Sequence, residues 1–246
     1  GLIFINNQWI NAEFETWTGD SGGDLYPSEG DDNSGADSLT GNTGDDTIDG
    51  GELEDTIKGS EGNDSILGGN GDDSIYGGEG ADTIYGQDGS DTIYGGASTD
   101  YIDGGDGDDS IRGGDWKDTI YGGNGNDLIN GGADIDVIHG QDGDDTISGD
   151  GGSDIAVFDG DRSDFTITYS NPSEDLSSNS ITVDGTDGID VITNVETLRF
   201  DDQDITSVDR ESGLTAWSSL SGTPTLEING SVTETTSLLT NEAAEL

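Results

Sequence analysis

The chain has 246 residues, of which 55 are acidic and 6 are basic, so its formal net charge at pH 7 is −49. Only 28% of the residues are hydrophobic and cysteine is absent, which excludes a conventional apolar core, disulfide bridges and cysteine-based metal sites. So negative a field repels phosphate backbones and anionic lipids, so we expect neither nucleic acid nor an anionic membrane as a partner. No apolar run is long enough for a membrane span.

Residues 1–31 are predicted to form an N-terminal cap and linker. Apolar and polar residues alternate around Leu2–Ile5, and Trp9, Phe14 and Trp17 follow closely, which is typical of one or two short strands. We expect these strands to shield the region that follows. The alternative is that they end a domain further upstream, since a chain without methionine is expected to be a piece of a longer protein.

Residues 32–157 consist of a nine-residue unit that is repeated fourteen times without an insertion. The eighth place is always apolar and mostly isoleucine, and the first place is glycine in all units but one. The fourth place is glycine in ten units, and its exceptions are Leu53, Ser98, Trp116 and Asp134. The sixth place is aspartate in every unit. These aspartates are Asp37, Asp46, Asp55, Asp64, Asp73, Asp82, Asp91, Asp100, Asp109, Asp118, Asp127, Asp136, Asp145 and Asp154.

Each unit is predicted to be a tight loop followed by a short strand. Glycines at the first, second and fourth places allow positive φ and a bare backbone, so loop carbonyls can converge on one centre. Three residues of strand follow, as in Thr83-Ile84-Tyr85, with the isoleucine pointing inward. A carboxylate beside converging carbonyls is a hard oxygen cage that suits Ca²⁺ and not zinc or copper. We therefore predict that the fourteen aspartates are calcium ligands and that the array folds only with bound cations.

This pattern resembles GGxGxDxUx, the nonapeptide of the repeats-in-toxin (RTX, hemolysin-type) family. The resemblance implies an all-β fold, a parallel β-roll that is a right-handed β-solenoid with two units per coil and about seven coils. Loops 18 residues apart then stack in two columns. The first column carries Asp37, Asp55, Asp73, Asp91, Asp109, Asp127 and Asp145. The second column carries Asp46, Asp64, Asp82, Asp100, Asp118, Asp136 and Asp154. The family places Ca²⁺ between successive loops of a column, which allows up to about twelve ions.

The second column contains an irregular stretch, because Ser98, Trp116 and Asp134 are neighbours within it. Trp116 and Asp134 would adopt the glycine conformation only with strain, and Lys117 adds a positive charge beside a cation site. We expect weaker calcium binding near Asp100, Asp118 and Asp136 than near Asp91, Asp109 and Asp127. The alternative is a contact patch around Trp116 for a protein or polysaccharide.

Outward strand positions bring Tyr76 beside Tyr94, with Arg112 beyond, so stacking and a cation–π contact are possible on one sheet. On the other sheet His139 lies beyond Tyr121, and we expect it to be solvated.

Residues 19–23, Gly-Asp-Ser-Gly-Gly, resemble the nucleophile motif of chymotrypsin-like proteases. Catalysis by Ser21 would need a base, and the only histidine, His139, follows the serine and lies on an outward strand position of the repeat region. We therefore predict that this chain is not an enzyme.

Residues 158–206 break the nine-residue period and are predicted to form an antiparallel β cap, which resembles the cap that follows many RTX arrays. Such a cap would cover the open edge of the roll. Residues 188–192, Gly-Ile-Asp-Val-Ile, echo the repeat once and are a candidate for another ion. Residues 207–246 resemble the C-terminal signal of type I secretion substrates, and the alternative is a further small β segment.

Together these features predict a secreted or cell-surface, calcium-binding RTX module of a bacterial protein. Its expected partners are calcium ions and, during export, the type I secretion machinery. Two alternatives remain, an extracellular structural or adhesive protein and the trailing module of a secreted hydrolase whose catalytic domain lies elsewhere.

Overall fold

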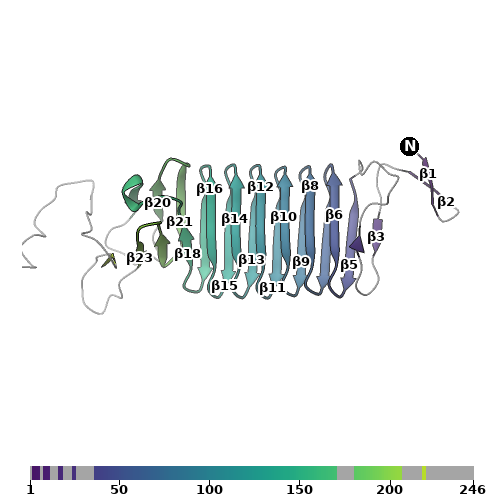
Figure 1. Ribbon diagram of the computed structural model, residues 1–246, viewed down its shortest axis with the longest axis horizontal. Helices are drawn as coiled ribbons and strands as arrows, with labels where there is room; N and C mark the ends of the chain where they lie inside the picture. The colour runs from purple at the N-terminus through teal and green to yellow at the C-terminus, as the bar shows by residue number, and fades with distance from the viewer. Residues whose placement is uncertain are drawn as a thin grey trace, which may run out of the picture.

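The computed structural model describes residues 36–170 and 180–206, together with short strands at 2–5, 8–11, 16–18, 24–25 and 218–219. Its strands stack side by side along one axis as a parallel β-solenoid (Figure 1). In the described part of the chain no helix is long and apolar enough to cross a membrane.

The repeat region forms a series of six-residue strands that follow one another at nine-residue intervals. They are β5 (Ser38–Thr43), β6 (Thr47–Glu52), β7 (Thr56–Glu61), β8 (Ser65–Asn70), β9 (Ser74–Glu79), β10 (Thr83–Asp88), β11 (Thr92–Ala97), β12 (Tyr101–Asp106), β13 (Ser110–Asp115), β14 (Thr119–Asn124), β15 (Leu128–Ala133), β16 (Val137–Asp142) and β17 (Thr146–Gly151). The shorter strand β18 (Ile155–Val157) ends the series.

Odd-numbered and even-numbered strands of this series belong to two separate sheets. Each strand pairs in parallel with the strand two places before and after it, so that Ile84 of β10 lies between Ile66 of β8 and Ile102 of β12. The register is a shift of 18 residues throughout the repeats. Two units therefore make one coil, and the predicted stack of about seven coils is confirmed.

The strands are longer than the three residues predicted, because they continue through the first three places of the next unit. Isoleucine at the eighth place and glycine at the following first place both point inward, as the alternating burial of β10 shows. The first-place glycines do not have the positive φ that the sequence suggested, whereas the second-place glycines and the fourth-place glycines from Gly44 to Gly143 do. At Gly86 the requirement is space, since a Cβ would collide with the Asp91 carboxylate and the Gly104 carbonyl.

A single file of apolar side chains fills the space between the two sheets. The eighth-place residues from Leu39 to Ala156 have at most 2% of their surface exposed. Phe158, Phe165 and Phe200 continue this core beyond the repeats, with ring centroids 5.1 to 5.7 Å apart. A narrow apolar core of this kind explains how a chain with so few hydrophobic residues can fold.

The C-terminal region first prolongs the solenoid and then turns antiparallel. Its elements are the 3-10 turn η1 (Arg162–Asp164) and the strands β19 (Thr166–Tyr169), β20 (Ile181–Asp184), β21 (Ile189–Thr193), β22 (Thr197–Arg199), β23 (Asp204–Thr206) and β24 (Ser218–Ser219). Strand β21 pairs in parallel with β17, and β22 pairs in parallel with β18. The pairs β19–β20, β20–β21 and β22–β23 are antiparallel, which confirms the predicted antiparallel end of the fold.

At the other end, β1 (Leu2–Ile5) and β2 (Gln8–Asn11) form an antiparallel pair. Strand β3 (Thr16–Thr18) pairs in parallel with β5, and β4 (Asp24–Leu25) pairs in parallel with β6. Four short strands therefore precede the first coil, where one or two were predicted. Ser21 and most of residues 207–246 lie outside the described residues.

Candidate metal-binding loops

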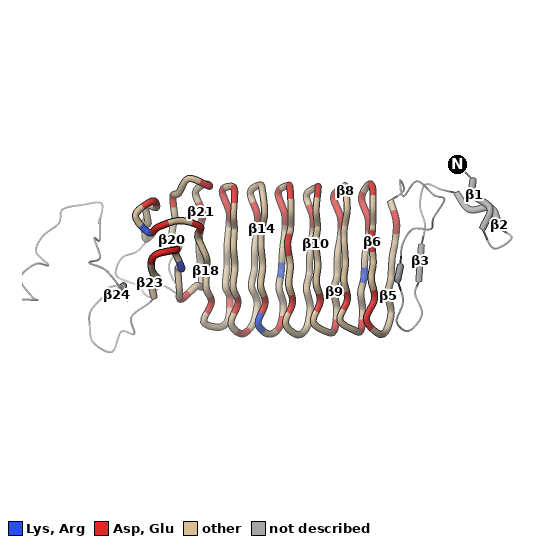
Figure 2. Tube along the Cα trace, viewed as in Figure 1, with Lys and Arg blue, Asp and Glu red and all other residues tan. Residues whose placement is uncertain are grey.

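The fourteen sixth-place aspartates lie at the turns between strands, where acidic residues gather along both long edges of the stack (Figure 2). All of them are buried, with at most 5% of their surface exposed. Strand alternation and the tight turn together place the carboxylate inside the coil, next to the first-place glycine of its own unit. The two columns predicted from the sequence are therefore present.

Within each column the buried carboxylates form a ladder of hydrogen bonds. The backbone N–H of Asp91 donates to Oδ1 of Asp109, one coil further on, at 2.7 Å. In the second column the N–H of Asp100 donates to Oδ1 of Asp118 at 2.9 Å. Equivalent bonds of 2.6 to 2.9 Å link all successive aspartates of both columns.

The other carboxylate oxygen, Oδ2, has no hydrogen-bond partner in a long run of these residues. The run comprises Asp55, Asp64, Asp73, Asp82, Asp91, Asp100, Asp109, Asp118, Asp127, Asp136, Asp145 and Asp154. A buried acceptor without a partner is costly and calls for a cation or a donor. The position that a Cβ of Gly122 would occupy is in contact with Oδ2 of Asp127 and lies 2.6 Å from the carbonyl oxygen of Gly140 in the next coil. Two hard oxygen atoms from adjacent coils therefore lie close together beside the bare Cα of Gly122, and such oxygens are the ligands that Ca²⁺ prefers.

Burial raises the pKa of these carboxyl groups well above the usual value. The pKa of Asp109 rises to about 7 and that of Asp118 to about 8, mainly through desolvation and partly through the like charges of neighbouring rungs. For Asp91 and Asp136 the pKa rises to about 6. A bound cation would favour the charged form and reverse these shifts.

No group of three or more acidic or histidine side chains suited to a metal is found among the described residues. This agrees with the repeat, because each loop contributes one buried carboxylate to its column. The remaining oxygens of any site here would come mainly from backbone carbonyls, as the glycine pattern predicts.

The loop tips contain a second set of contacts. In the first column the N–H of Gly89 donates to the carbonyl of Asp106 at 2.8 Å, and Gly107 and Gly125 make the same bond. At the four fourth places without glycine, which are Leu53, Ser98, Trp116 and Asp134, no such bond is made in the described structure. All four nevertheless adopt positive φ, between 74° and 88°. The predicted backbone strain of the irregular stretch is therefore present.

Fifth-place side chains form an outer ladder that the sequence analysis missed. Oδ1 of Asp108 accepts from the N–H of Asn126 at 2.7 Å, and Oδ1 of Asn126 accepts from the N–H of Asp144 at 2.8 Å. Recurrence of Asp or Asn at the fifth place 18 residues apart could have revealed it. In the irregular stretch the fifth place holds Thr99, Lys117 and Ile135. The last two side chains have no acceptor atom, so they cannot continue the ladder.

The irregular stretch also exposes large side chains. Trp116 is 63% exposed, and Lys117, which follows it in the same loop, is also exposed. Ile135, in the next loop of the column, is 48% exposed.

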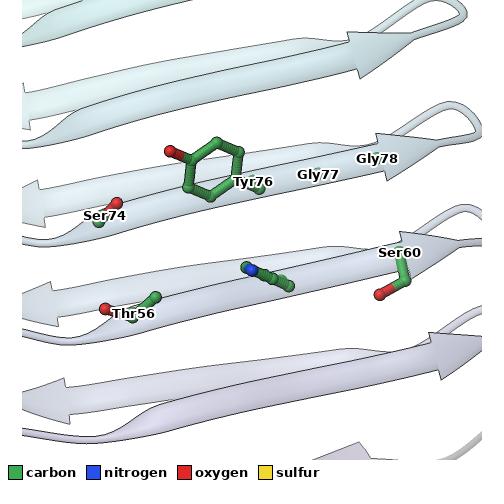
Figure 3. Close-up of a pocket in the computed structure, with 7 residues that line it drawn as sticks. Thr56, Ser60, Ser74, Tyr76, Gly77 and Gly78 are labelled. Carbon is green, nitrogen blue, oxygen red and sulfur yellow. The ribbon is translucent and has the colours of Figure 1, made fainter.

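The outer faces of the sheets carry rows of aromatic and basic side chains. Tyr76 and Tyr94 lie with ring centroids 6.3 Å apart, flanked by Lys58 and Arg112, each 5.9 Å from the nearer ring. The predicted cation–π contact of Arg112 is confirmed, but the two tyrosine rings are tilted by 53° and not stacked as predicted. An open pocket beside Tyr76 lies on the same face (Figure 3). On the other sheet His139 stacks on Tyr121 at 4.3 Å. It is half-buried with a pKa lowered by desolvation, so the expectation of a solvated histidine was wrong.

Comparison with known proteins agrees with this geometry. No curated protein sequence matches the chain significantly. The family model described as "RTX calcium-binding nonapeptide repeat (4 copies)" matches residues 31–52, 49–84, 76–111, 85–120, 103–138 and 121–156. These segments together run from residue 31 to residue 156, just over half of the chain. The chain therefore belongs to the RTX calcium-binding nonapeptide repeat family.

Proposed function

We propose that this chain is a calcium-binding β-roll module of a type I secreted bacterial protein, which folds on binding Ca²⁺ outside the cell. The observation that carries the proposal is the run of buried carboxylates whose Oδ2 atoms have no hydrogen-bond partner. The proposed ligands are the fourteen sixth-place aspartates with carbonyl oxygens of the loop backbones. Residues 32–157 would be the binding region and residues 158–206 its cap.

The physical basis is the balance between charge and core. The two sheets enclose only one inward apolar side chain per unit, mostly isoleucine, while every unit also buries a carboxylate. Stacking these carboxylates one coil apart brings like charges together in a poorly hydrated space. When bound, calcium supplies the positive charge that offsets this repulsion. Binding free energy then becomes folding free energy, and the metal-free chain is unfolded at neutral pH.

This coupling suits export. Extracellular-grade calcium sites bind at roughly 10⁻⁴ to 10⁻³ M, so they would be empty at the low free calcium of the cytosol. The chain would pass the secretion machinery unfolded and fold on reaching external calcium. The absence of cysteine and the composition of residues 207–246 support this interpretation.

Ions would lie between successive loops of each column, which allows six per column and about twelve in the repeats. Within the chain we assign no catalytic role to any residue. The chain would stabilise or display other parts of its parent protein, a hydrolase being one such parent.

The proposal is tested by circular dichroism of the purified chain in EGTA, after addition of calcium, and after addition of magnesium at the same concentration. We expect little β structure in EGTA, full β structure with calcium and much less with magnesium, because Mg²⁺ demands stricter octahedral geometry. A chain that keeps its β spectrum after complete removal of calcium contradicts the proposal.

A second candidate function is an adhesive surface, favoured by the 63% exposure of Trp116 beside Lys117 on an otherwise acidic loop edge. Such a surface would contact a protein or a polysaccharide through the indole ring. Trp116→Ala should then abolish binding to that partner without changing the calcium-induced dichroism spectrum. Unchanged binding in a screen of bacterial surface polysaccharides and proteins would remove this candidate.

A further inference from the structure

The outer surface of the sheet formed by the odd-numbered strands is free of acidic side chains over most of its length. Its outward residues lie at the seventh, ninth and second places, because the eighth-place and first-place residues point inward. From β5 to β15 none of these outward residues is Asp or Glu. Acidic residues return only at the third place, on the loop edge, and next to β11 even this place is Ala97. This surface therefore contrasts with the acidic loops on either side of it.

Four ninth-place side chains form a row across the middle of this surface. Parallel pairing sets Lys58 of β7 beside Tyr76 of β9, and Tyr94 of β11 beside Arg112 of β13. Tyr76 and Tyr94 are also paired, and they are 44% and 37% exposed. With strands roughly 4.8 Å apart, the row is about 14 Å long. These four residues, named here the tyrosine row, include two of the six basic residues of the whole chain.

The surroundings of the tyrosine row are polar but uncharged. The open pocket between β7 and β9 is lined by Lys58 and Tyr76 together with the hydroxyl-bearing residues Thr56, Ser60 and Ser74 (Figure 3). The second places of β9, β11 and β13 are all glycine, so no side chain rises above the sheet there. A strip of hydroxyl groups therefore lies on one side of the row and a bare strip of backbone on the other, which leaves both ring faces accessible to a ligand.

The ninth-place row of the other sheet has a different character. In the order of the stack it consists of Asp49, Leu67, Tyr85, Asp103, Tyr121 and His139. The ring of Tyr101 lies between those of Tyr85 and Tyr121, at centroid distances of 5.7 and 5.5 Å, and no Lys or Arg lies at an outward place of β6 to β18. The repeat therefore accepts a carboxylate at its ninth place, so the fold does not require the absence of acids around the tyrosine row.

These groups fit a sugar chain that carries acidic groups. The C–H faces of sugar rings pack on aromatic rings, sugar hydroxyls pair with short hydroxyl side chains, and carboxylates or sulfates pair with Lys and Arg. A peptide could not add to this sheet as a strand, because β7, β9, β11 and β13 are each paired on both sides. A nucleic acid carries a charge on every unit and would also meet the acidic loop edges. Charges spaced along a glycan can instead reach the two cations, while salt screens the more distant loops.

We propose that the tyrosine row binds an acidic polysaccharide, with sugar rings packed on Tyr76 and Tyr94 and carboxylate or sulfate groups paired with Lys58 and Arg112. This site goes beyond the proposed calcium function and requires only that the roll is folded. It is also separate from the surface around Trp116, which lies at a loop tip.

The test is isothermal titration calorimetry of the calcium-saturated full chain with oligosaccharides of hyaluronan, which carry a carboxylate on every second sugar. Oligosaccharides of chondroitin sulfate, titrated in parallel, show whether sulfate is preferred to carboxylate. Hyaluronan oligosaccharides whose carboxylates have been reduced to alcohols are the matched uncharged probe. We expect the reduced probe to bind at least about fivefold more weakly than its acidic parent, because it loses its charge-assisted hydrogen bonds.

Variants then locate the site. Tyr94→Ala removes a ring from the tyrosine row, and we expect it to weaken binding about tenfold. Arg112→Gln removes one cation and should weaken binding about threefold, and Lys58→Gln should do the same. Tyr85→Ala, at the same place of the repeat on the opposite sheet, is the matched control and should leave the affinity unchanged. Circular dichroism with calcium checks that each variant is folded.

A folded wild-type chain that binds neither acidic oligosaccharide overturns this proposal and leaves the calcium-dependent folding intact. Equal losses in Tyr94→Ala and Tyr85→Ala overturn the location, and equal affinity for the reduced probe overturns the role of the two cations. Binding to polyglutamate in place of both glycans would assign the row to an acidic peptide and so overturn the polysaccharide. A wild-type chain that stays unfolded in calcium contradicts the proposed function instead, and its dichroism spectrum distinguishes this outcome from the others.

Discussion

The two loop columns carry the same buried ladder but differ at their tips. Between residues 89 and 145 the first column has Gly89, Gly107, Gly125 and Gly143 at the fourth place, and each donates its N–H to the next coil. Over the same coils the second column has Ser98, Trp116 and Asp134, whose N–H groups make no such bond in the described structure. The inner bonds are nevertheless almost equal, 2.7 Å from Asp91 to Asp109 and 2.9 Å from Asp100 to Asp118.

This difference separates two roles within one repeat. The sixth-place carboxylate and the space beside the first-place glycine keep the coils in register, and they are intact in both columns. The fourth-place glycine adjusts only the loop tip, where its replacement costs positive-φ strain and one hydrogen bond. Calcium affinity is therefore expected to differ between the columns while the fold does not.

Acidification should have the largest effect because it acts on both columns at once. The folded-state pKa values are raised above the ordinary 3.8, to about 7 for Asp109 and about 8 for Asp118. The folded metal-free chain therefore binds more protons than the unfolded chain, and its stability increases as the pH falls and is lost as the pH rises through about 6 to 8.

We accordingly expect calcium affinity to fall steeply between about pH 8 and about pH 5, since protons compete for the same carboxylates. In EGTA the β structure should increase over the same range. Calcium titrations and dichroism at several pH values measure both trends. A calcium affinity that does not change with pH would contradict the assignment of buried carboxylates as ligands.

Removal of one ladder charge should have a smaller, column-dependent effect. Asp109→Asn and Asp118→Asn each keep an Oδ1 acceptor in the same region of the rod, but each removes a charged ligand. We expect a loss on the order of tenfold in calcium affinity for Asp109→Asn, and less for Asp118→Asn because its column binds more weakly at the start. Isothermal titration calorimetry compares them. Equal losses would indicate that the loop tips have no influence.

Substitutions at the fourth place should have opposite effects in the two columns, unfavourable in the first and favourable in the second. In Gly107→Ala a Cβ would collide with the Gly89 carbonyl at a φ of 134°, so we expect a loss of more than about 1 kcal/mol in the stability of the calcium-bound fold. Trp116→Gly relieves a φ of 79° and should raise calcium affinity, with a gain within about 1 kcal/mol. Urea unfolding at saturating calcium measures the stability of both variants, and a calorimetric calcium titration measures the affinity of Trp116→Gly. A destabilised Trp116→Gly would show that the indole ring contributes contacts that outweigh the strain.

The smallest effect is expected for Lys117→Ala. The exposed ammonium of Lys117 lies in the loop of Asp118. It disfavours binding of Ca²⁺ there only through electrostatic repulsion, which solvent and salt screen. Calcium affinity should rise by a few tenths of a kcal/mol at low salt and by less at high salt. Affinities measured at two ionic strengths check this, and an unchanged value at low salt would rule out the charge of Lys117 as a cause of weaker binding.

Much of the fold could be predicted because the period is fixed. Aspartate occupies every sixth place and isoleucine occupies almost every eighth place, and these two residues determine which side chains point into each coil. A nine-residue unit without insertions determines the register between strands. The predicted strand length of three residues was wrong because the first-place glycines were assigned to the loop. Gly86 instead lies within a strand, where it leaves room for a close contact with the Asp91 carboxylate.

Contacts across long separations could not be derived from the period. Glu196 does not follow the repeat, and its place on the Asp154 ladder depends on how the chain returns after β21. Asp190 was suggested by the local echo of the repeat, but its register with Asp145 required the three-dimensional structure.

The central claim is that the buried aspartate ladders are the calcium sites, and anomalous diffraction from crystals grown with calcium tests it most directly. We predict anomalous peaks beside Oδ2 of successive sixth-place aspartates in both columns, weaker near Asp100, Asp118 and Asp136 than near Asp91, Asp109 and Asp127. Peaks confined to exposed carboxylates of the strands or loop tips, with none along the two ladders, would contradict the account.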